Sequence, residues 1–394
     1  MRLPIIMMLI VLLLSGTIDY YIYRAIKRHT KSRRWLNIHT YSAILFFTYL
    51  IISISLPRRN GSNELLISIM WLLFAYMSIY IPKFIFVLSD AISYIPKLWK
   101  HKRWQATTYI GIGISTISFI LMWWGALVNR YNIDIQEHSI AISDLPQAFD
   151  GYKIVQISDL HVGSYGKDSE FIDKLVAKIN SLEADVIVFT GDIVNRNTKE
   201  LLPFIDTLSK LHAKDGVFSI LGNHDYGDYS DWKSDAEKQQ NMQLMYELQQ
   251  KMGWKLLLND TRMLYRGNDS IAIIGVENVG DPPFKIYGSL DDAYSTLNDS
   301  VTKILLSHNP AHWAKDIKNN PDKNIALTLS GHTHAMQLSF CNLSLAALRY
   351  DTWGGLYNDN KNQHLYVNVG IGTVALPMRI GATPEITILT LKRK

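Results

Sequence analysis

The hydrophobic pattern of this 394-residue chain changes near residue 130. Before that point, apolar residues form four long stretches, at about 3–22, 36–56, 65–88 and 105–129. A helix needs about 20 mostly apolar residues to cross the hydrocarbon core of a bilayer, so this pattern predicts an all-α transmembrane region of about four helices over residues 1–129. No intramembrane charged pair is expected, and the pattern therefore gives no indication of transport.

Beyond this region, short apolar runs alternate with polar loops and helical patterns. Residues 130–150 are typical of a linker and an initial strand, and residues 151–394 then form one further domain. The expected strands are 152–157, 185–190, 217–221, 271–276, 303–306, 325–329, 365–369 and 386–391, and the expected helices are 169–181, 198–212 and 236–251. Such alternation predicts an α/β sheet whose polar loops lie together at the carboxyl ends of the strands. The sequence leaves open whether the polar segment 226–252 acts as a lid.

The charge of the chain is divided in the same way as its hydrophobicity. The first 129 residues hold 14 Lys and Arg against three acidic residues, a balance of +11, whereas the whole chain carries +5 and the remainder therefore −6. A mildly acidic second domain argues against a nucleic acid partner, because phosphate binding needs a basic surface. The single cysteine, Cys341, excludes an internal disulfide.

The basic residues also predict an orientation in the membrane. The loops 24–34 and 97–103 are strongly basic, which indicates the cytoplasmic side, whereas the loop 57–64 faces out. The domain after residue 130 is then expected on the extracytoplasmic side of the cytoplasmic membrane. A cleaved signal peptide is the alternative for the first apolar stretch, but its basic residues follow the apolar run instead of preceding it.

Potential metal ligands follow five of the expected strands. They are Asp159 with His161, Asp192, Asn223, His308, and His332 with His334, and a further histidine, His224, directly follows Asn223. Each alone is typical of a helix cap, a turn or a surface histidine, but independent caps and turns would not supply this set. Oxygen and imidazole donors without cysteine favour divalent ions such as Mn, Fe, Zn or Co. Seven ligands exceed what one ion with open positions for water takes, so the set predicts two ions that share one carboxylate.

The order of these motifs resembles that of a known family, the calcineurin-like metallophosphoesterases. The motifs are Asp159-x-His161, Gly191-Asp192, Gly222-Asn223-His224-Asp225, His308 and Gly331-His332-Thr333-His334. The later segments Gly354-Gly355-Leu356-Tyr357 and Pro384-Glu385-Ile386-Thr387 are similar to the bacterial membrane-associated branch of that family. That branch commonly has two glycines and a glutamine after G-H-T-H, where this chain has Ala335-Met336-Gln337. The resemblance implies a four-layer α/β/β/α sandwich with helices outside two facing mixed sheets.

The resemblance also implies roles for the site residues. Ion one would be held by Asp159, His161, Asp192 and His334, and ion two by Asp192, Asn223, His308 and His332. Asp192 would bridge the two ions, and a metal-bridging hydroxide would attack the phosphate ester. His224 is left free of metal, where it stabilises the phosphorane oxygens or protonates the leaving group, and Asp225 would orient its imidazole.

The substrate class is less defined by the sequence. A membrane region, together with the apolar stretch 340–348 soon after the last ligand pair, favours a phosphodiester or a lipid-linked phosphate as substrate and membrane lipids as partners; ordinary core is the alternative for that stretch. A pyrophosphatase similar to UDP-2,3-diacylglucosamine hydrolase, a protein phosphatase and a non-catalytic ligand-binding membrane receptor stay open as alternatives. The sequence does not decide the metal's identity, the preference for monoesters or diesters, or the oligomeric state.

Overall fold

The computed structural model describes residues 5–30, 32–294, 300–318, 320, 325–341, 343–359 and 363–394. The chain forms two compact units. One holds the residues up to Val128 together with the short segment Ala375–Met378, and the other holds the rest of the chain from Asn129 onward. Each unit is described separately below.

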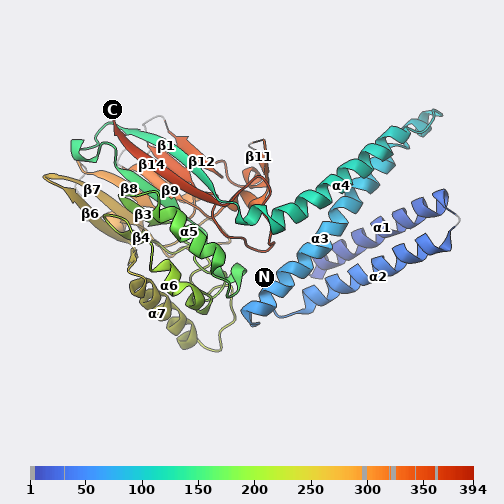
Figure 1. Cartoon of the computed structure of the whole chain (residues 1–394), viewed down its shortest axis with the longest axis horizontal. Helices are drawn as coiled ribbons and strands as arrows, with labels where there is room; N and C mark the ends of the chain where they lie inside the picture. The colour runs from blue at the N-terminus through green and yellow to red at the C-terminus, as the bar shows by residue number, and fades with distance from the viewer. Residues whose placement is uncertain are drawn as a thin grey trace. The chain divides into compact units, whose positions relative to one another are not determined.

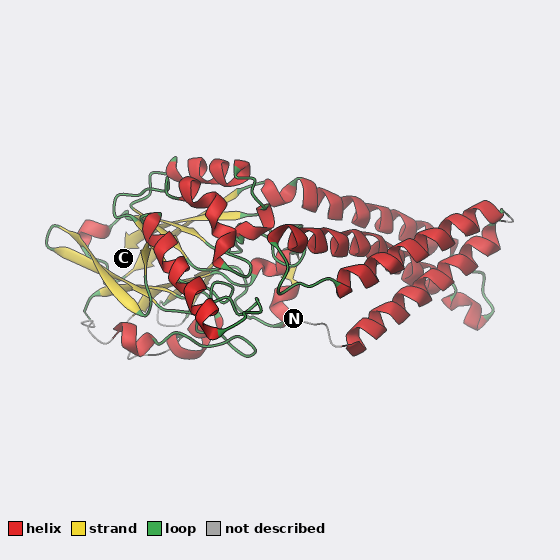
Figure 2. Cartoon of the chain, turned by 90° about the horizontal axis from the view of Figure 1, so that it is seen from below, coloured by secondary structure: helices red, strands yellow, loops and turns green. Residues whose placement is uncertain are grey.

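The first unit consists of four long helices (Figures 1 and 2). They are α1 (Ile5–His29), α2 (Arg33–Ser55), α3 (Asn63–Ile92) and α4 (Gln105–Leu127). All four are long and apolar enough to cross a membrane, where the backbone groups of a spanning segment must be satisfied within the helix. Helix α1 extends beyond the expected apolar stretch 3–22. Its last turn, which contains Lys27, Arg28 and His29, is basic and is also helical.

The helices contain a charged pair that the sequence did not suggest. Lys83 of α3 lies 2.8 Å from the Asp19 carboxylate of α1, which also accepts a hydrogen bond of 2.6 Å from Tyr80. The expectation that no charged pair would lie within these segments is therefore wrong. A charge in this environment is costly unless it has a partner, and here the partner comes from another helix.

The second unit is built on two six-stranded mixed sheets (Figure 1). The first sheet has the order β1 (Asp134–Ile142), β14 (Glu385–Arg393), β2 (Lys153–Ile157), β3 (Val186–Phe189), β4 (Val217–Ser219) and β5 (Lys255–Leu256). The second has the order β12 (Gly355–Asn358), β13 (His364–Val367), β9 (Ile325–Ser330), β8 (Thr302–Leu306), β7 (Asp269–Gly275) and β6 (Asp260–Arg266). Strands β2, β3 and β4 are parallel neighbours in the first sheet, as are β7, β8 and β9 in the second.

The two sheets face each other across a shared apolar core. Val188 and Phe218 from the first sheet pack there with Ile273 and Leu329 from the second. These strands are continuous apolar runs because both of their faces are covered, as is usual for parallel strands.

Helices cover the outer face of each sheet. Helices α5 (Glu170–Asn180) and α7 (Asp235–Lys251) pack on the first sheet, and α8 (Leu290–Tyr294) packs on the second with a π-helical turn at Trp313–Ile317. The expected four-layer α/β/β/α sandwich is confirmed. Helix α7 belongs to the outer layer because its Met245 is fully buried in that core, so the helical part of segment 226–252 is not a lid.

One predicted helix differs from the structure, and one strand was not predicted. The helix expected at 198–212 is a 3₁₀-helix at Thr198–Phe204, followed by the short α6 (Ile205–Leu208). Pro203 lies inside this segment and cannot donate the backbone hydrogen bond of a regular α-helix. Strand β6 was not predicted, because an edge strand needs little burial and only Leu264 of its residues is buried.

Candidate metal centre

The predicted ligands meet at one edge of the sandwich. Each follows the carboxyl end of a strand: β2, β3 and β4 in the first sheet, and β8 and β9 in the second. Their donor atoms form two groups, in each of which all atoms lie within 4.8 Å of one another. The groups are Asp159, His161, Asp192 and His334, and Asp192, His308 and His332. Asp192 belongs to both.

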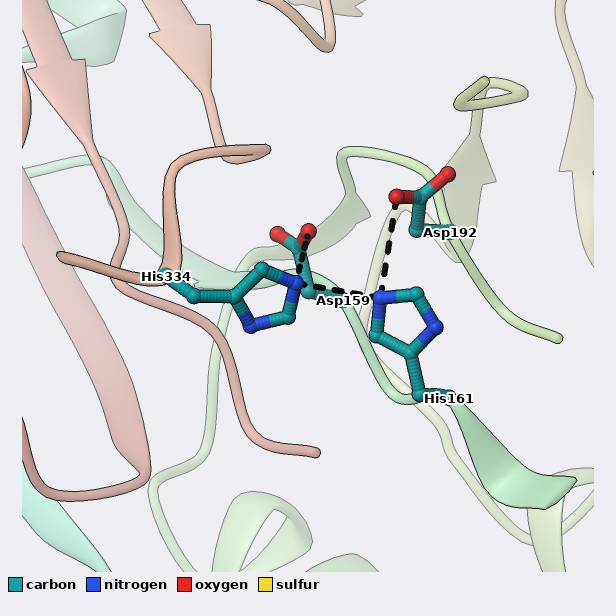
Figure 3. Close-up of side chains that lie close together, drawn as sticks. All are labelled: Asp159, His161, Asp192 and His334. Carbon is teal, nitrogen blue, oxygen red and sulfur yellow. Dashed lines mark hydrogen bonds and ion pairs between the residues drawn. The ribbon is translucent and has the colours of Figure 1, made fainter. Parts of the chain in front are cut away.

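The first group is buried, and its four side chains lie close together (Figure 3). The Nε2 atoms of His161 and His334 are 3.0 Å apart. His334 Nε2 lies 3.1 Å from Asp159 Oδ1, and His161 Nε2 lies 3.6 Å from Asp192 Oδ2. All four side chains therefore turn their donor atoms toward one point.

The second group is arranged around His308. Its Nε2 atom lies 3.2 Å from Asp192 Oδ2, 3.2 Å from His332 Nδ1 and 3.2 Å from Asn223 Oδ1. The Asn223 amide nitrogen donates to the Tyr229 hydroxyl at 2.9 Å, which leaves its oxygen directed at this group. The structure thus brings all seven predicted ligands together.

These distances fit metal ions. Two ligands that each lie about 2.1 Å from one ion are themselves about 3.0–3.4 Å apart in octahedral or tetrahedral geometry. Most of the donor separations above fall in or near that range. The facing nitrogens of His161 and His334 also need a cation or a shared proton between them, because two unprotonated nitrogens repel. The residues therefore fit the divalent ions that the donor types predict.

The electrostatics of the centre agree with this fit. Burial alone would lower the pKa of His308, but the carboxylates of Asp192 and Asp159 outweigh it and raise that pKa to about 9. Burial works to raise the pKa of Asp192, yet His308 and His224 hold it well below its ordinary value. Burial, followed by the charge of His308, lowers the pKa of His332 to about 3. The carboxylates thus create a negative potential that favours positive charge beside them, as a cation site requires.

The motif glycines allow the ligand loops to approach one another. A Cβ atom added to Gly222 would lie 2.2 Å from Asp192 Oδ1, and one added to Gly331 would lie 2.3 Å from Asp159 Oδ2. Real side chains do not come this close, so only glycine fits at either position. The glycines are therefore part of the ligand geometry and not merely turn residues.

The ligand backbones themselves are strained. Five of the seven predicted ligands have φ in the left-handed region, which costs non-glycine residues of the order of 1–3 kcal/mol each. They are Asp159 (52°), His161 (42°), Asp192 (61°), His332 (74°) and His334 (51°). Strain of this kind persists where the surrounding structure holds it, and it gathers at functional sites.

The same strain continues where the chain departs from the branch pattern. Ala335, Met336 and Gln337 have φ of 49°, 48° and 58°. Glycine adopts this region without steric cost, which explains why two glycines are common in the first two positions. This chain keeps the turn with side chains in place, and the Gln337 side chain holds it by accepting from the Val374 amide at 2.6 Å.

His224 lies beside the cluster, but its ring is not oriented by Asp225, as the resemblance had implied. Its Nδ1 atom lies 2.6 Å from the Asn195 carbonyl oxygen, and its ring stacks on Tyr229 at 4.2 Å. Asp225 is instead buried, where its carboxylate accepts from four backbone amides of the loops at 192–194 and 222. The expected contact between Asp225 and the His224 ring is wrong. Asp225 fixes the loops that carry Asp192.

Three further residues contact the ring nitrogens of the histidines that do not face the cluster. The Thr190 carbonyl oxygen lies 2.8 Å from His308 Nδ1, the Tyr350 hydroxyl lies 3.1 Å from His332 Nε2, and Arg379 Nη2 lies 3.2 Å from His334 Nδ1. Such outer contacts set the orientation of ligating imidazoles. The sequence reasoning missed all three. Thr190 could have been found, because it directly precedes Gly191-Asp192, whereas the other two carry no local signal.

Comparisons with known proteins agree with the fold and the site. Residues 152–336 match the family model described as calcineurin-like phosphoesterase, and residues 1–130 match the model for a probable calcineurin-like phosphoesterase transmembrane domain. The uncharacterised metallophosphoesterase YkuE of Bacillus subtilis is 35% identical over 271 residues, which are 66% of this chain and 86% of that protein. An uncharacterised metallophosphoesterase of Campylobacter jejuni is 27% identical over 390 residues, 98% of each chain.

A vertebrate relative is also similar. The zebrafish transmembrane protein with metallophosphoesterase domain is 31% identical over 260 residues, which are 64% of this chain and 56% of that protein. The match thus spans little more than half of that relative's length. Fold, ligand cluster and matches together define a membrane protein of the metal-dependent phosphoester hydrolase class. The chain belongs to the calcineurin-like metallophosphoesterases, as the motif order predicted.

Proposed function

We propose that this chain hydrolyses phosphodiesters or lipid-linked phosphates with two divalent ions held at the candidate metal centre. The observation that carries the proposal is the position of Asp192, which belongs to both ligand groups: its Oδ2 atom lies 3.6 Å from His161 Nε2 and 3.2 Å from His308 Nε2. One ion would be held by Asp159, His161, Asp192 and His334, and the other by Asp192, Asn223, His308 and His332. Mn, Fe, Zn and Co all suit these nitrogen and oxygen donors.

When bound, a pair of such ions lowers the pKa of water and stabilises the charge that develops at phosphorus. The chain's own contribution beyond the ligands is His224. Because a carbonyl oxygen only accepts, the contact with Asn195 places a proton on Nδ1 and leaves Nε2 for the substrate side. In its protonated form, His224 gives the Nε2 proton to the leaving alcohol oxygen as the bond between phosphorus and that oxygen breaks.

The side of the centre near His332 supplies polar and aromatic groups for the rest of the substrate. The Phe284 ring lies edge-on to His332 at 4.7 Å, and the Tyr350 hydroxyl contacts both His332 and Asp281. Arg349 is paired with Asp281 at 2.8 Å, and its side chain is partly exposed. A cationic group and two rings at this position suit a phosphate flanked by an organic group, which supports a diester or a lipid-linked phosphate as substrate.

The orientation of the chain is also part of the proposal. The basic loops support a catalytic unit on the extracytoplasmic side of the cytoplasmic membrane. A reporter enzyme that is active only outside the cytoplasm, fused after Lys394, tests this side directly. Activity of a cytoplasmic reporter at the same position would contradict it and would favour a cytoplasmic nucleotide substrate.

The central experiment uses the full chain in detergent, stripped with a chelator and reloaded with Mn, Zn, Fe or Co. Metal content per chain is measured by mass spectrometry, and hydrolysis is followed with bis(p-nitrophenyl) phosphate, p-nitrophenyl phosphate and a phospholipid in mixed micelles. We expect two ions per chain and metal-dependent turnover that favours the diester. Asp192→Asn should lose turnover and bind fewer ions, whereas Asp144→Asn, at an exposed aspartate outside the ligand set, should behave as wild type.

Two results would overturn the proposal. One ion per chain at saturating metal, with full turnover, would rule out the two-ion arrangement. Two ions per chain without turnover of any of the three substrates would replace the enzyme with a ligand-binding protein. Equal turnover of soluble and micellar diesters would remove the reason for a lipid-linked substrate.

A further inference from the structure

A small hairpin beside the metal centre exposes large apolar side chains. Strands β10 (Ser339–Phe340) and β11 (Leu343–Ser344) pair antiparallel, and the 3₁₀-helix Leu345–Leu348 follows them directly. The exposed fractions are 80% for Phe340, 72% for Leu343 and 86% for Leu348. Grouped apolar side chains of this kind mark an interaction surface more often than single exposed ones do. We call the described residues of this segment, 339–341 and 343–348, the apolar hairpin.

The apolar hairpin is firmly attached at its base. Leu338 forms a parallel bridge with Ile380, the Ser339 amide donates to the Ile380 carbonyl at 2.8 Å, and the Ile380 amide donates to the Gln337 carbonyl at 2.9 Å. A Cβ atom at Gly381 would lie 1.8 Å from the Ser339 carbonyl oxygen, so the two backbones are in the closest contact that glycine allows. The loop 379–383 and the apolar hairpin therefore move together.

The same loop holds the residue at which the chain enters this unit. The Asn129 side chain donates to the Arg379 carbonyl at 3.0 Å and lies 3.4 Å from Thr383 Oγ1. Asn129 is only 2% exposed, as is Arg130, whose guanidinium donates to the Ser164 carbonyl at 3.3 Å. The chain thus enters the second unit at a fixed point, and this point shares a loop with the base of the apolar hairpin.

That entry point follows directly, along the chain, on a helix that is long and apolar enough to cross a membrane. Helix α4 ends at Leu127, two residues before Asn129, and its last turns carry Trp123 and Trp124, a residue type that is enriched at membrane–water interfaces. One residue, Val128, lies between Leu127 and Asn129, which is too short for a flexible linker. A segment bound to Asn129 through one loop is therefore connected to the end of α4 by a short and well-held path.

We propose that the apolar hairpin inserts its side chains into the lipid surface and so keeps the metal centre at the bilayer. The base of the hairpin is continuous with the centre, because Ser344 Oγ donates to the carbonyl oxygen of Ala335, the residue after His334. A lipid surface is favoured over a second copy of the chain because the loop at the base of the hairpin binds Asn129, which follows the end of the membrane-spanning candidate α4 by two positions. Interfacial elements of this kind lie about 5–10 Å into the boundary between headgroups and acyl chains. The proposal concerns lipid contact and does not depend on hydrolytic activity.

The chain offers a direct test, because its single cysteine, Cys341, is exposed within this hairpin. The full chain is labelled at Cys341 with an environment-sensitive fluorophore and reconstituted into phosphatidylcholine vesicles. Quenching is then measured with iodide in the water and with nitroxide-labelled lipids in the bilayer. The matched control carries the same label at Asn268→Cys in a Cys341→Ser background. Asn268 is exposed in the turn between β6 and β7, at the sheet edge opposite the centre.

We expect the Cys341 label to have blue-shifted emission, several-fold weaker iodide quenching than the Asn268 label, and strong quenching by nitroxides near the headgroups. The Asn268 label should be quenched by iodide and not by lipid nitroxides. Iodide quenching of both labels to the same extent would refute insertion. Protection of the Cys341 label from both iodide and lipid nitroxides would also refute it, and would assign the hairpin to a contact between protein chains. Metal content and turnover of the labelled chain, measured in parallel, keep this result separate from the proposed hydrolysis.

Discussion

Gly331 offers a sharp test of how closely the ligand loops are packed. A Cβ atom at this position would lie 2.0 Å from Ser158 Oγ and 2.3 Å from Asp159 Oδ2. Its φ is outside the left-handed region, so Gly331→Ala is opposed by these contacts and not by the backbone conformation. Since non-bonded atoms prefer about 3.5 Å, the Asp159 carboxylate must move by about 1 Å.

The size of the effect follows from this displacement. A misplacement of about 1 Å at a reacting centre lowers the rate about a hundredfold, which corresponds to about 2.7 kcal/mol of transition-state stabilisation. Overpacking of a buried site costs about 1–3 kcal/mol of stability, which a domain of this size tolerates. We therefore expect Gly331→Ala to stay folded while it loses metal at the Asp159 side and about 99% of its turnover.

The assay compares metal content, hydrolysis of bis(p-nitrophenyl) phosphate and thermal unfolding for the wild type and two variants. Gly354→Ala serves as the control, because its added methyl group would meet only the Val369 Cγ1 atom, at 3.0 Å. The control should keep both ions and turnover. Wild-type metal content and turnover in Gly331→Ala would refute the reasoning, and so would equal losses in both variants.

Three further predictions test other parts of the molecule. His224→Ala should lower the hydrolysis of an alkyl diester about 10²–10⁴-fold and that of a p-nitrophenyl diester much less, since a poor leaving group needs the proton more. Burial raises the pKa of Glu200 to about 7 despite the Asn195 amide and Arg196, so the folded state binds more protons than the unfolded one between the ordinary pKa and 7. The free energy of unfolding should therefore fall by up to about 3 kcal/mol as pH rises through that window. Glu200→Gln should raise the thermal unfolding midpoint near pH 8 and change it little near pH 5. An unchanged midpoint near pH 8 would contradict this. Within the helices, Asp19→Asn alone should lower stability in detergent by about 3–5 kcal/mol, and adding Lys83→Met should restore part of it; additive losses would show that the pair is not coupled.

The sequence predicted that these side chains lie together because each of them follows a recognisable apolar strand. The parallel order of β2, β3 and β4 then brings their carboxyl ends together, so local patterns were sufficient for Asp159, Asp192 and Asn223. Contacts that join distant loops gave no such signal. Arg379 and His334 are 45 residues apart, and neither lies in a strand whose register would predict the contact.

The expected role of Asp225 failed for a related reason. Adjacency in sequence suggested that its carboxylate would orient the His224 ring, but successive residues of a turn point in different directions. The carbonyl that holds the ring belongs to Asn195, 29 residues earlier. Likewise, the pairing of Asp19 with Lys83 joins residues 64 positions apart on two helices, and apolar periodicity alone does not show which helices are neighbours.

The distribution of hydrogen bonds explains why the metal centre can tolerate its strain. The two sheets are joined beneath the site, where the Gln156 side chain of β2 donates to the Ser330 carbonyl of β9 at 2.8 Å. Within the second sheet, the Gly331 amide donates to the His308 carbonyl at 2.9 Å. Asp225 fixes the opposite loops through four backbone amides. The ligand backbones are therefore held in the left-handed region from below, by groups that never meet the substrate. Since two carboxylates and four histidines crowd one buried point, binding of cations there should favour the folded state, and the strained loops should be most ordered when the metal is present.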